Sequence, residues 1–194
     1  MKVHLIHGIH TSPDSPVRGL LVYLMDAGFD ARYPEYGYEL AVETRLLNPA
    51  VEGVLLPYIE PGDILVGHSN GCAIAYHLLL QGAPVRGAVF INGALQSAIR
   101  RPDKCEFIDV YCNSGDRITE VAKFAEKAHI VDEEWEELGH TGYVGNDPAI
   151  QNFHCDITKG MPVVSGHSDF FTPEKLKEWG PFLTQRLRSK NVIS

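Results

Sequence analysis

The sequence predicts an α/β fold in which a mostly parallel sheet carries helices on both faces. Short apolar runs alternate along the chain with stretches whose apolar residues recur at helical spacing. This alternation is typical of repeated strand–helix–strand units, which need parallel strands and helices on both faces of the sheet. The chain has 194 residues, of which 44% are hydrophobic and 22% charged, and no repeat or linker divides it. We therefore expect residues 1–194 to form one domain.

Apolar runs that end in turn residues predict the strands, and apolar spacing predicts the helices. The predicted strands are Val3–Ile6, Phe29–Tyr33, Asp63–Gly67, Val85–Ile91 and Phe107–Tyr111. The predicted helices run from Val17 to Gly28, from Leu40 to Tyr58 with a break near Pro49, over 71–81, and over Ile118–Ala128 and Pro173–Arg188. Residues 132–166 fit the alternation least. We expect a long excursion there, with one or two short strands.

The charge and the cysteines exclude several classes of protein. Seventeen Lys and Arg stand against 25 Asp and Glu, a net charge of −8, which argues against a nucleic-acid or anionic-membrane partner. No apolar run approaches the roughly 20 residues of a membrane span, and the first apolar stretch is too short for a signal peptide. The four cysteines form no C-x-x-C pair, and a chain of this size needs no disulfide. We therefore expect reduced, mostly buried thiols, with two disulfides as the alternative, and a cytoplasmic protein. The sequence carries no signal for an oligomeric state.

The strongest chemical signal is the segment Gly67-His68-Ser69-Asn70-Gly71, which matches G-x-S-x-G. It directly follows a predicted strand and directly precedes a predicted helix, which is the context that the motif requires. Small residues on either side allow a turn sharp enough to lift the serine hydroxyl above the sheet edge. The helix N-terminus then lies beneath a developing oxyanion. The motif predicts Ser69 as a nucleophile; the alternative is a structural Gly/Ser turn.

This motif and two that follow it resemble those of the α/β-hydrolase superfamily, in its small, uncapped, esterase- or lipase-like form. The resemblance covers nearly the whole chain and implies the order Ser, Asp, His. The segment Asn113–Ile118 is similar to the family's acid turn and implies that Asp116 orients the base; the alternative is a helix cap. The segment Ser165–Phe171 is similar to the histidine loop and implies that His167 is the general base; the alternative is a surface histidine.

The resemblance also implies an oxyanion hole. In the family, an HG pair such as His7-Gly8 leads into the loop that donates one backbone N–H, which here belongs to Ile9 or His10. The second donor is the backbone N–H of Asn70, next after the nucleophile. We expect His7 itself to be structural and to shape this loop.

Other titratable residues are weaker candidates. His68 adjoins the nucleophile, but adjacent side chains on a tight turn point apart, so we expect it to pack. Asp63 opens a strand at the opposite end of the sheet and should be structural. Asp169 is an alternative acid, and His140 and His154 are alternative bases upstream of the expected histidine loop.

No metal or cofactor is expected. Candidate ligands cluster within 28 residues, but without the spacing of H-E-x-x-H or C-x-x-C. They are His140, His154, Cys155, Asp156 and His167. Neither of the glycine-rich phosphate-binding patterns follows the first strand, which argues against a nucleotide cofactor. Acidic residues at 132–137 are interpreted as a solvated face.

Spacing predicts an open site. Only 14 residues, Asn92–Cys105, separate the fourth predicted strand from the next strand region, too few for a cap domain. We expect walls from 11–16, 95–99 and 132–166, where Trp135, Tyr143 and Phe153 either line the pocket or pack within the loops. The chain is short for the family and resembles its minimal core, without the first two strands of the usual sheet.

These observations together predict a serine hydrolase that cleaves a small or extended carboxylic ester or thioester through Ser69, His167 and Asp116. An amidase, peptidase or acyltransferase would use the same three residues, because the scaffold does not set the leaving group. A binding protein on a hydrolase scaffold with a silent site is the alternative outside enzymes.

Overall fold

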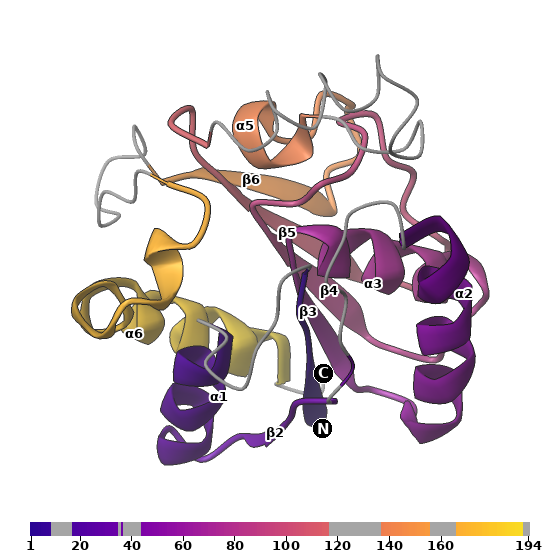
Figure 1. The fold of residues 1–194 in the computed structure, drawn as a ribbon, viewed down its shortest axis with the longest axis horizontal. Helices are drawn as coiled ribbons and strands as arrows, with labels where there is room; N and C mark the ends of the chain where they lie inside the picture. Colours follow the sequence, from indigo (N-terminus) through magenta and orange to yellow (C-terminus); the bar gives the residue numbers. More distant parts are fainter. Residues whose placement is uncertain (9–16, 35, 37–43, 117–136, 156–165, 192–194) are drawn as a thin grey trace.

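The computed structural model describes residues 1–8, 17–34, 36, 44–116, 137–155 and 166–191. Six strands of these residues form one sheet in the order β2-β1-β3-β4-β5-β6 (Figure 1). The strands are β1 (Lys2–Ile6), β2 (Asp30–Arg32), β3 (Ile64–His68), β4 (Gly87–Ile91), β5 (Phe107–Cys112) and β6 (Ile150–His154). Every neighbouring pair is parallel, so the carboxyl ends of all six strands lie at the same end of the sheet.

Helices cover both faces of this sheet, as the sequence predicts. Helices α1 (Val17–Asp26) and α6 (Pro173–Asn191) lie together on one side, and α2 (Thr44–Leu55) and α3 (Asn70–Leu80) lie on the other (Figure 1). Helix α2 continues through Pro49, so the predicted break there is wrong; the helix ends in a 3-10 turn, η2 (Leu56–Tyr58). The predicted helix over 118–128 lies outside the described residues.

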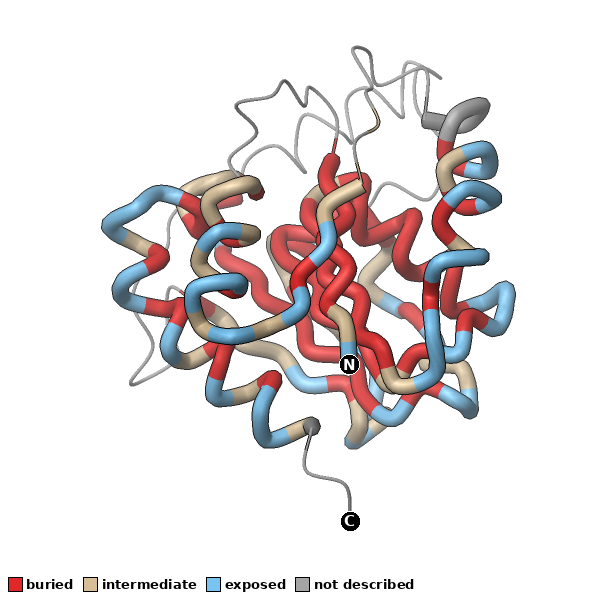
Figure 2. The backbone as a smooth tube through the Cα atoms, turned by 90° about the horizontal axis from the view of Figure 1, so that it is seen from below, coloured by how far each residue is buried: buried red, intermediate tan, exposed pale blue. Residues whose placement is uncertain are grey.

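Two apolar cores lie between the sheet and its helices. The buried residues follow the strands at the centre of the molecule and parts of the helices beside them (Figure 2). On the α1/α6 side, the fully buried Trp179 ring packs against Phe170 and Tyr111, with ring centroids 5.1 and 5.8 Å apart. A buried ion pair crosses the same face, where Arg186 of α6 contacts both oxygens of Asp109 at 2.8 and 3.0 Å. On the other side, nearly all of α3 is buried.

The excursion predicted over 132–166 contributes a strand to the sheet. Strand β6 pairs with β5 at the sheet edge, and a short helix, α5 (Leu138–Thr141), packs near the end of β5. Between β4 and β5 the chain forms no helix or strand, so no cap domain is inserted there. Within the described ranges, no helix has the length and hydropathy that a membrane span requires.

All four cysteines are buried thiols, as the sequence predicts. Burial raises the pKa of the Cys105 thiol to about 11 and raises the pKa of Cys72 as well. These thiols are therefore protonated at neutral pH and poorly reactive.

Candidate active site

Ser69 forms a sharp turn between β3 and α3. Its backbone has φ 56° and ψ −127°, a combination that a non-glycine residue rarely adopts and that costs about 1–3 kcal/mol. Three main-chain hydrogen bonds hold it there. The Ser69 N–H donates to the Ile91 carbonyl at 3.2 Å, and the Ser69 carbonyl accepts from Cys72 and Ala94 at 3.0 and 3.1 Å. The surrounding backbone thus fixes the strained residue at the end of β3.

The glycines of the motif are required by close packing around this turn. A Cβ on Gly67 would lie 2.7 Å from the Gly71 carbonyl oxygen, and a Cβ on Gly71 would overlap the carbonyl oxygen of Ile6 in β1. A Cβ on Gly8 would lie 2.7 Å from the Ser69 Cβ and 3.1 Å from its Oγ. The chain that leaves β1 therefore runs directly beside the serine side chain. Ile9 and His10 lie outside the described residues.

Asp116 and His167 meet although they are 51 residues apart. His167 Nδ1 lies 3.0 Å from Asp116 Oδ1 and 2.9 Å from Oδ2, and the carboxylate is fully buried. An ionised carboxylate can only accept, so Nδ1 carries the hydrogen, and Nε2 of a neutral ring is left as an acceptor. This is the tautomer that a general base needs.

His167 also lies against the residue that precedes Ser69. The rings of His68 and His167 have centroids 4.8 Å apart, and His68 Nε2 lies 3.0 Å from the His167 carbonyl oxygen. Burial, then the neighbouring His167, lowers the pKa of His68 to about 3, so its ring stays neutral. A second aromatic contact, edge-on to Phe171 at 4.7 Å, supports the packing role expected for His68.

Asn70 lies at the first position of α3 with its side chain fully buried. Its amide pairs reciprocally with that of Asn48 in α2, through hydrogen bonds of 3.1 and 3.0 Å. The backbone N–H groups of a first helical turn have no carbonyl partner within the helix, so they are available to an anion. The pairing with Asn48 fixes the residue that would supply one of them.

His7 is buried and packed rather than exposed to the site. Its ring stacks on Tyr36 with centroids 3.8 Å apart and on Tyr33 at 5.2 Å, and Nδ1 lies 2.9 Å from the Gly8 carbonyl oxygen. Burial lowers its pKa. These contacts support the structural role expected for it, in shaping the chain after β1.

The weaker candidates lie elsewhere or have other partners. Asp63 is buried and accepts hydrogen bonds from the backbone of Lys2 and Glu60, besides its contact with His4, which fits a structural role. His154 Nδ1 lies 3.3 Å from the Cys112 sulfur. In the part of the chain that the structure describes, no three potential ligands converge on a metal position; Asp156 lies outside it.

Several side chains of the expected pocket walls pack against other residues, a role that the sequence had left open for Tyr143 and Phe153. Leu95 and Ile99 are 1% and 4% exposed and belong to the core beneath α3, because their side chains point inward from the loop after β4. Phe153 stacks on Tyr111 at 4.9 Å in the core on the α6 side. Tyr143 accepts a hydrogen bond from the Asp147 backbone at 3.0 Å, which stabilises its own loop. Residues 11–16 and Trp135 lie outside the described ranges.

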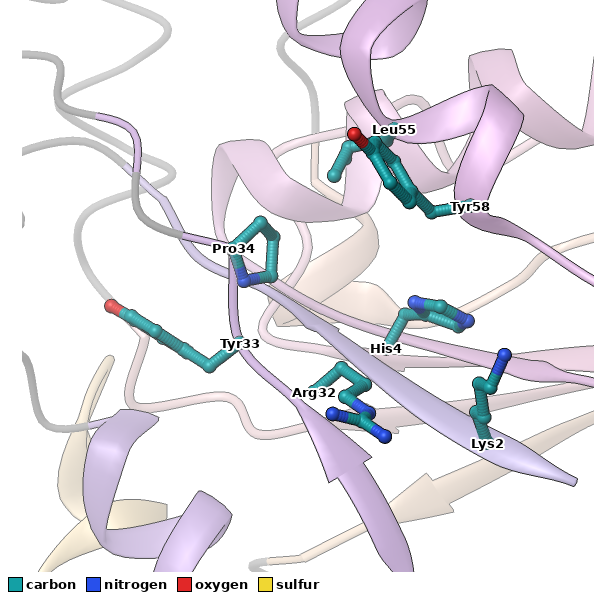
Figure 3. Close-up of a pocket in the computed structure, with 7 residues that line it drawn as sticks. All are labelled: Lys2, His4, Arg32, Tyr33, Pro34, Leu55 and Tyr58. Carbon is teal, nitrogen blue, oxygen red and sulfur yellow. The ribbon is translucent and has the colours of Figure 1, made fainter.

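A pocket of about 340 Å³ lies away from these groups, against β1 and β2 (Figure 3). Its lining residues are Lys2, His4, Arg32, Tyr33, Pro34, Leu55 and Tyr58. Each of its three basic side chains has a carboxylate oxygen within 2.8 Å. The charges of Lys2 and Arg32 are thus already paired with carboxylates, and Ser69, Asp116 and His167 do not line the pocket.

Sequence reasoning missed two buried asparagines at the ends of neighbouring strands. Asn92 directly follows β4 and Asn113 directly follows β5. The Asn92 amide donates to the carbonyls of Gly166 and His167 at 3.0 and 2.8 Å, and accepts from the Asn113 amide at 3.1 Å. Their position in the sequence could have revealed them, because polar residues just after parallel strands lie at the carboxyl ends of the strands, where ligands bind.

The comparisons with known proteins agree on architecture. A search of protein-family models and a search of curated proteins found no match. Among solved structures, the chain is similar to MGS-MChE2, an alpha/beta hydrolase from the metagenome of Mar Chica lagoon sediments, with a TM-score of 0.61 and 14% identity over 98% of this chain and 92% of that one. The chain has the α/β-hydrolase fold.

Two further structures resemble the fold of this chain over most of their length. One is the ydeN gene product of B. subtilis, with a TM-score of 0.59, 15% identity and coverage of 99% of both chains. The other is a predicted CIB-like hydrolase from Thermoplasma acidophilum, with a TM-score of 0.56, 16% identity and coverage of 97% and 86%. At such identities the likeness concerns the fold, and the chemistry must be argued from this chain's own residues.

Proposed function

We propose that this protein is a serine hydrolase that cleaves a carboxylic ester or thioester, with Ser69, His167 and Asp116 as its catalytic residues. The observation that carries the proposal is the contact of both Asp116 oxygens with His167 Nδ1, together with the packing of the His167 ring against His68, the residue before a serine held in a strained strand-to-helix turn. Among the structural neighbours, those from Pyrococcus furiosus and Nitrososphaera gargenis are named an esterase and carboxylesterases, which supports ester chemistry.

The proposed reaction begins with attack on the substrate carbonyl. Ser69 Oγ adds to the carbon while His167 Nε2 takes the hydroxyl proton, and Asp116 stabilises the resulting imidazolium. The oxyanion accepts hydrogen bonds from the backbone N–H groups of Asn70 and Ile9. His167 then gives its proton to the departing alcohol or thiol, which leaves an acyl-serine. Water, deprotonated by the same ring, releases the acid and restores Ser69.

Two measurements on the purified protein test this reaction. A fluorophosphonate should label Ser69 alone, as located by mass spectrometry, and p-nitrophenyl esters of increasing acyl length should be hydrolysed. Ser69→Ala should lose the label and lower kcat by about 10⁴-fold or more. Normal ester turnover by Ser69→Ala would refute the assignment. A folded wild-type protein that neither labels nor hydrolyses any ester would instead favour a binding protein with a silent site.

A further inference from the structure

The main chain that carries His167 is held by hydrogen bonds from the sheet. We define the His167 loop as Gly166–Ser168, which directly precedes the 3-10 turn η3 (Asp169–Phe171). The His167 carbonyl accepts from the Asn92 amide at 2.8 Å and lies 3.0 Å from His68 Nε2. The Gly166 carbonyl accepts from the same Asn92 amide at 3.0 Å. Two consecutive carbonyls of this loop are therefore tied to the ends of β3 and β4.

The orientation of the Asn92 amide is fixed by its surroundings. Its Oδ1 accepts from the Asn113 amide at 3.1 Å, so its NH₂ group must face the two loop carbonyls. A reversed amide would place Oδ1 against two carbonyl oxygens and lose every one of these bonds. The side chain is fully buried, where each lost hydrogen bond is costly because water cannot replace it.

The backbone of Asn92 is equally constrained. Its φ is 45°, a left-handed conformation that asparagine tolerates better than most residues. Its N–H donates to the Tyr111 carbonyl of β5 at 2.9 Å. On the other side, α5 packs so closely that a Cβ on Gly139 would lie 2.7 Å from the Asn92 carbonyl carbon and 3.0 Å from Asp116 Oδ2. The same short helix thus contacts both Asn92 and the buried acid.

His68 supplies a further donor to this loop, besides the Asn92 amide and the Asn113 amide, which donates to the Gly166 carbonyl at 3.4 Å. A carbonyl oxygen can only accept, so the hydrogen of the neutral His68 ring lies on Nε2 and points at the His167 carbonyl. The ring is 7% exposed and packs against both His167 and Phe171. His68 is consequently unable to accept a proton at Nε2, and its contribution to the site is to hold the neighbouring loop.

We propose that Asn92 and His68 are positioning residues that hold the His167 ring between Asp116 and Ser69 by clamping the Gly166 and His167 carbonyls. The role of the ring as a base rests on the function proposed above, whereas the clamp itself concerns only the placement of His167. A misplacement of about 1 Å at a reacting group can lower the rate by about 10²-fold, so the clamp has a measurable catalytic effect.

Asn92→Asp tests the clamp with a side chain of the same shape. The carboxylate has no N–H to donate and would face two carbonyl oxygens. We expect kcat for a hydrolysed p-nitrophenyl ester to fall by about 10²-fold with KM within about threefold of wild type. We also expect the far-downfield proton resonance of the His167–Asp116 hydrogen bond to shift or disappear. Unchanged kcat together with an unchanged resonance would overturn the proposal.

A matched control carries the same substitution elsewhere. The Asn152 amide in β6 also holds a loop by two backbone bonds, accepting from the Tyr143 N–H and donating to its carbonyl, both at 2.8 Å. Asn152→Asp should lower the melting temperature but leave kcat and the downfield resonance near wild type. If both variants lower kcat equally, the effect is a general loss of stability and the clamp is refuted.

A pair of variants at His68 separates the donated hydrogen bond from ring packing. His68→Gln keeps an N–H donor, whereas His68→Phe keeps an aromatic ring beside Phe171 and loses the donor. We expect His68→Gln to retain most of kcat and His68→Phe to lose about tenfold or more. Wild-type kcat in His68→Phe would remove His68 from the clamp.

The proton resonance of the His167–Asp116 hydrogen bond distinguishes failure of the clamp proposal from failure of the hydrolase proposal. If the wild-type protein hydrolyses no ester and Ser69 takes no label, the hydrolase proposal fails, but a resonance lost in Asn92→Asp and kept in Asn152→Asp still supports the clamp. If Asn92→Asp does not fold, Asn92→Gly replaces it, because glycine adopts the same positive φ without supplying a donor. A normal resonance in folded Asn92→Gly would overturn the proposal.

Discussion

Replacing Asp116 with Asn removes the charge from the buried carboxylate that contacts His167 Nδ1 through both oxygens, at 2.9 and 3.0 Å. The amide keeps the shape, but it offers one oxygen and one NH₂ group in place of two acceptors. In one orientation the neutral oxygen still accepts from Nδ1, without a charge to stabilise the imidazolium. In the other, the NH₂ group donates to Nδ1, which moves the ring hydrogen to Nε2 and blocks proton acceptance from Ser69.

The size of the effect follows from this geometry. Loss of the correct tautomer lowers kcat by about 10⁴-fold in triads of this kind. At about 1.4 kcal/mol per tenfold, this corresponds to roughly 5 kcal/mol in the activation free energy. The free energy of unfolding should change much less, because the amide still fills the same space and keeps a hydrogen bond. Ester turnover at pH 7 and urea unfolding, measured on the same preparation, give both quantities.

Asp109→Asn is the matched control. Asp109 lies in β5 and is fully buried like Asp116, but it pairs with Arg186 instead of a histidine. It should weaken that ion pair and lower the free energy of unfolding while leaving kcat near wild type. An Asp116→Asn variant within tenfold of wild-type kcat, or an Asp109→Asn variant with as low a kcat as Asp116→Asn, would refute the reasoning about the tautomer.

Three further predictions concern stability and reactivity. Below pH 6.5 the unfolded state protonates His68, while the folded state does not until about pH 3, so the free energy of unfolding should fall by up to about 1.4 kcal/mol for each unit that the pH is lowered. Urea titrations between pH 6.5 and 4 measure this slope, which should be smaller in His68→Gln. Gly71→Ala should lower the melting temperature and abolish labelling of Ser69, because its Cβ would overlap the Ile6 carbonyl. Gly53→Ala in α2 has open space around it and should stabilise the fold by about 0.5–1 kcal/mol, so equal melting temperatures of the two variants would contradict this packing. The four thiols should react with a chromogenic disulfide only after urea unfolding, and rapid reaction of the native protein would show that they are less protected than their burial indicates.

The strands that the sequence predicts well are those buried on both faces. Every residue of β3, β4 and β5 is buried, and most of these residues are apolar, so the sequence displays these strands as largely apolar runs; the exceptions are His68 and Asp109. Strand β6 could not be located in the same way, since only Ile150 is buried in the edge strand Ile150–His154 and its other residues include Gln and Asn. That 1–194 forms one domain stays a prediction.

Helix α2 shows why a propensity rule failed. Proline lowers helix stability, yet α2 runs through Pro49. Asn48 pairs with Asn70 of α3, and Glu52 lies 3.0 Å from His77 and accepts from Gln81 at 2.6 Å. These contacts across α2 and α3 hold the helix in place, and they join residues more than 20 positions apart that no local pattern reveals.

The residues of the candidate site that directly follow a strand or precede the final helix could be proposed from the sequence. The motif around Ser69, the acid turn and the histidine loop were recognisable because each has a fixed place relative to a strand or to the final helix. The link from Asn92 to His167 spans 75 residues and depends on a positive φ at Asn92. This hydrogen bond can form only when β3, β4 and β5 lie side by side. The sequence alone therefore places Asn92 at a strand end but does not reveal that His167 is its partner.

The attachment of η3 has a consequence for how the protein loses activity on heating. Phe170 and Phe171 are buried, and the Trp179 indole donates to the Phe170 carbonyl, so the stretch that follows His167 is held by α6 as well as by the contact of Phe171 with His68 of β3. Release of this stretch from α6, together with loss of the bonds from Asn92 and His68 to the His167 loop, would separate the imidazole from the serine while the strands keep their amide protons protected from exchange. Thermal inactivation would then precede global melting, and cooling would restore turnover without any need to refold the sheet.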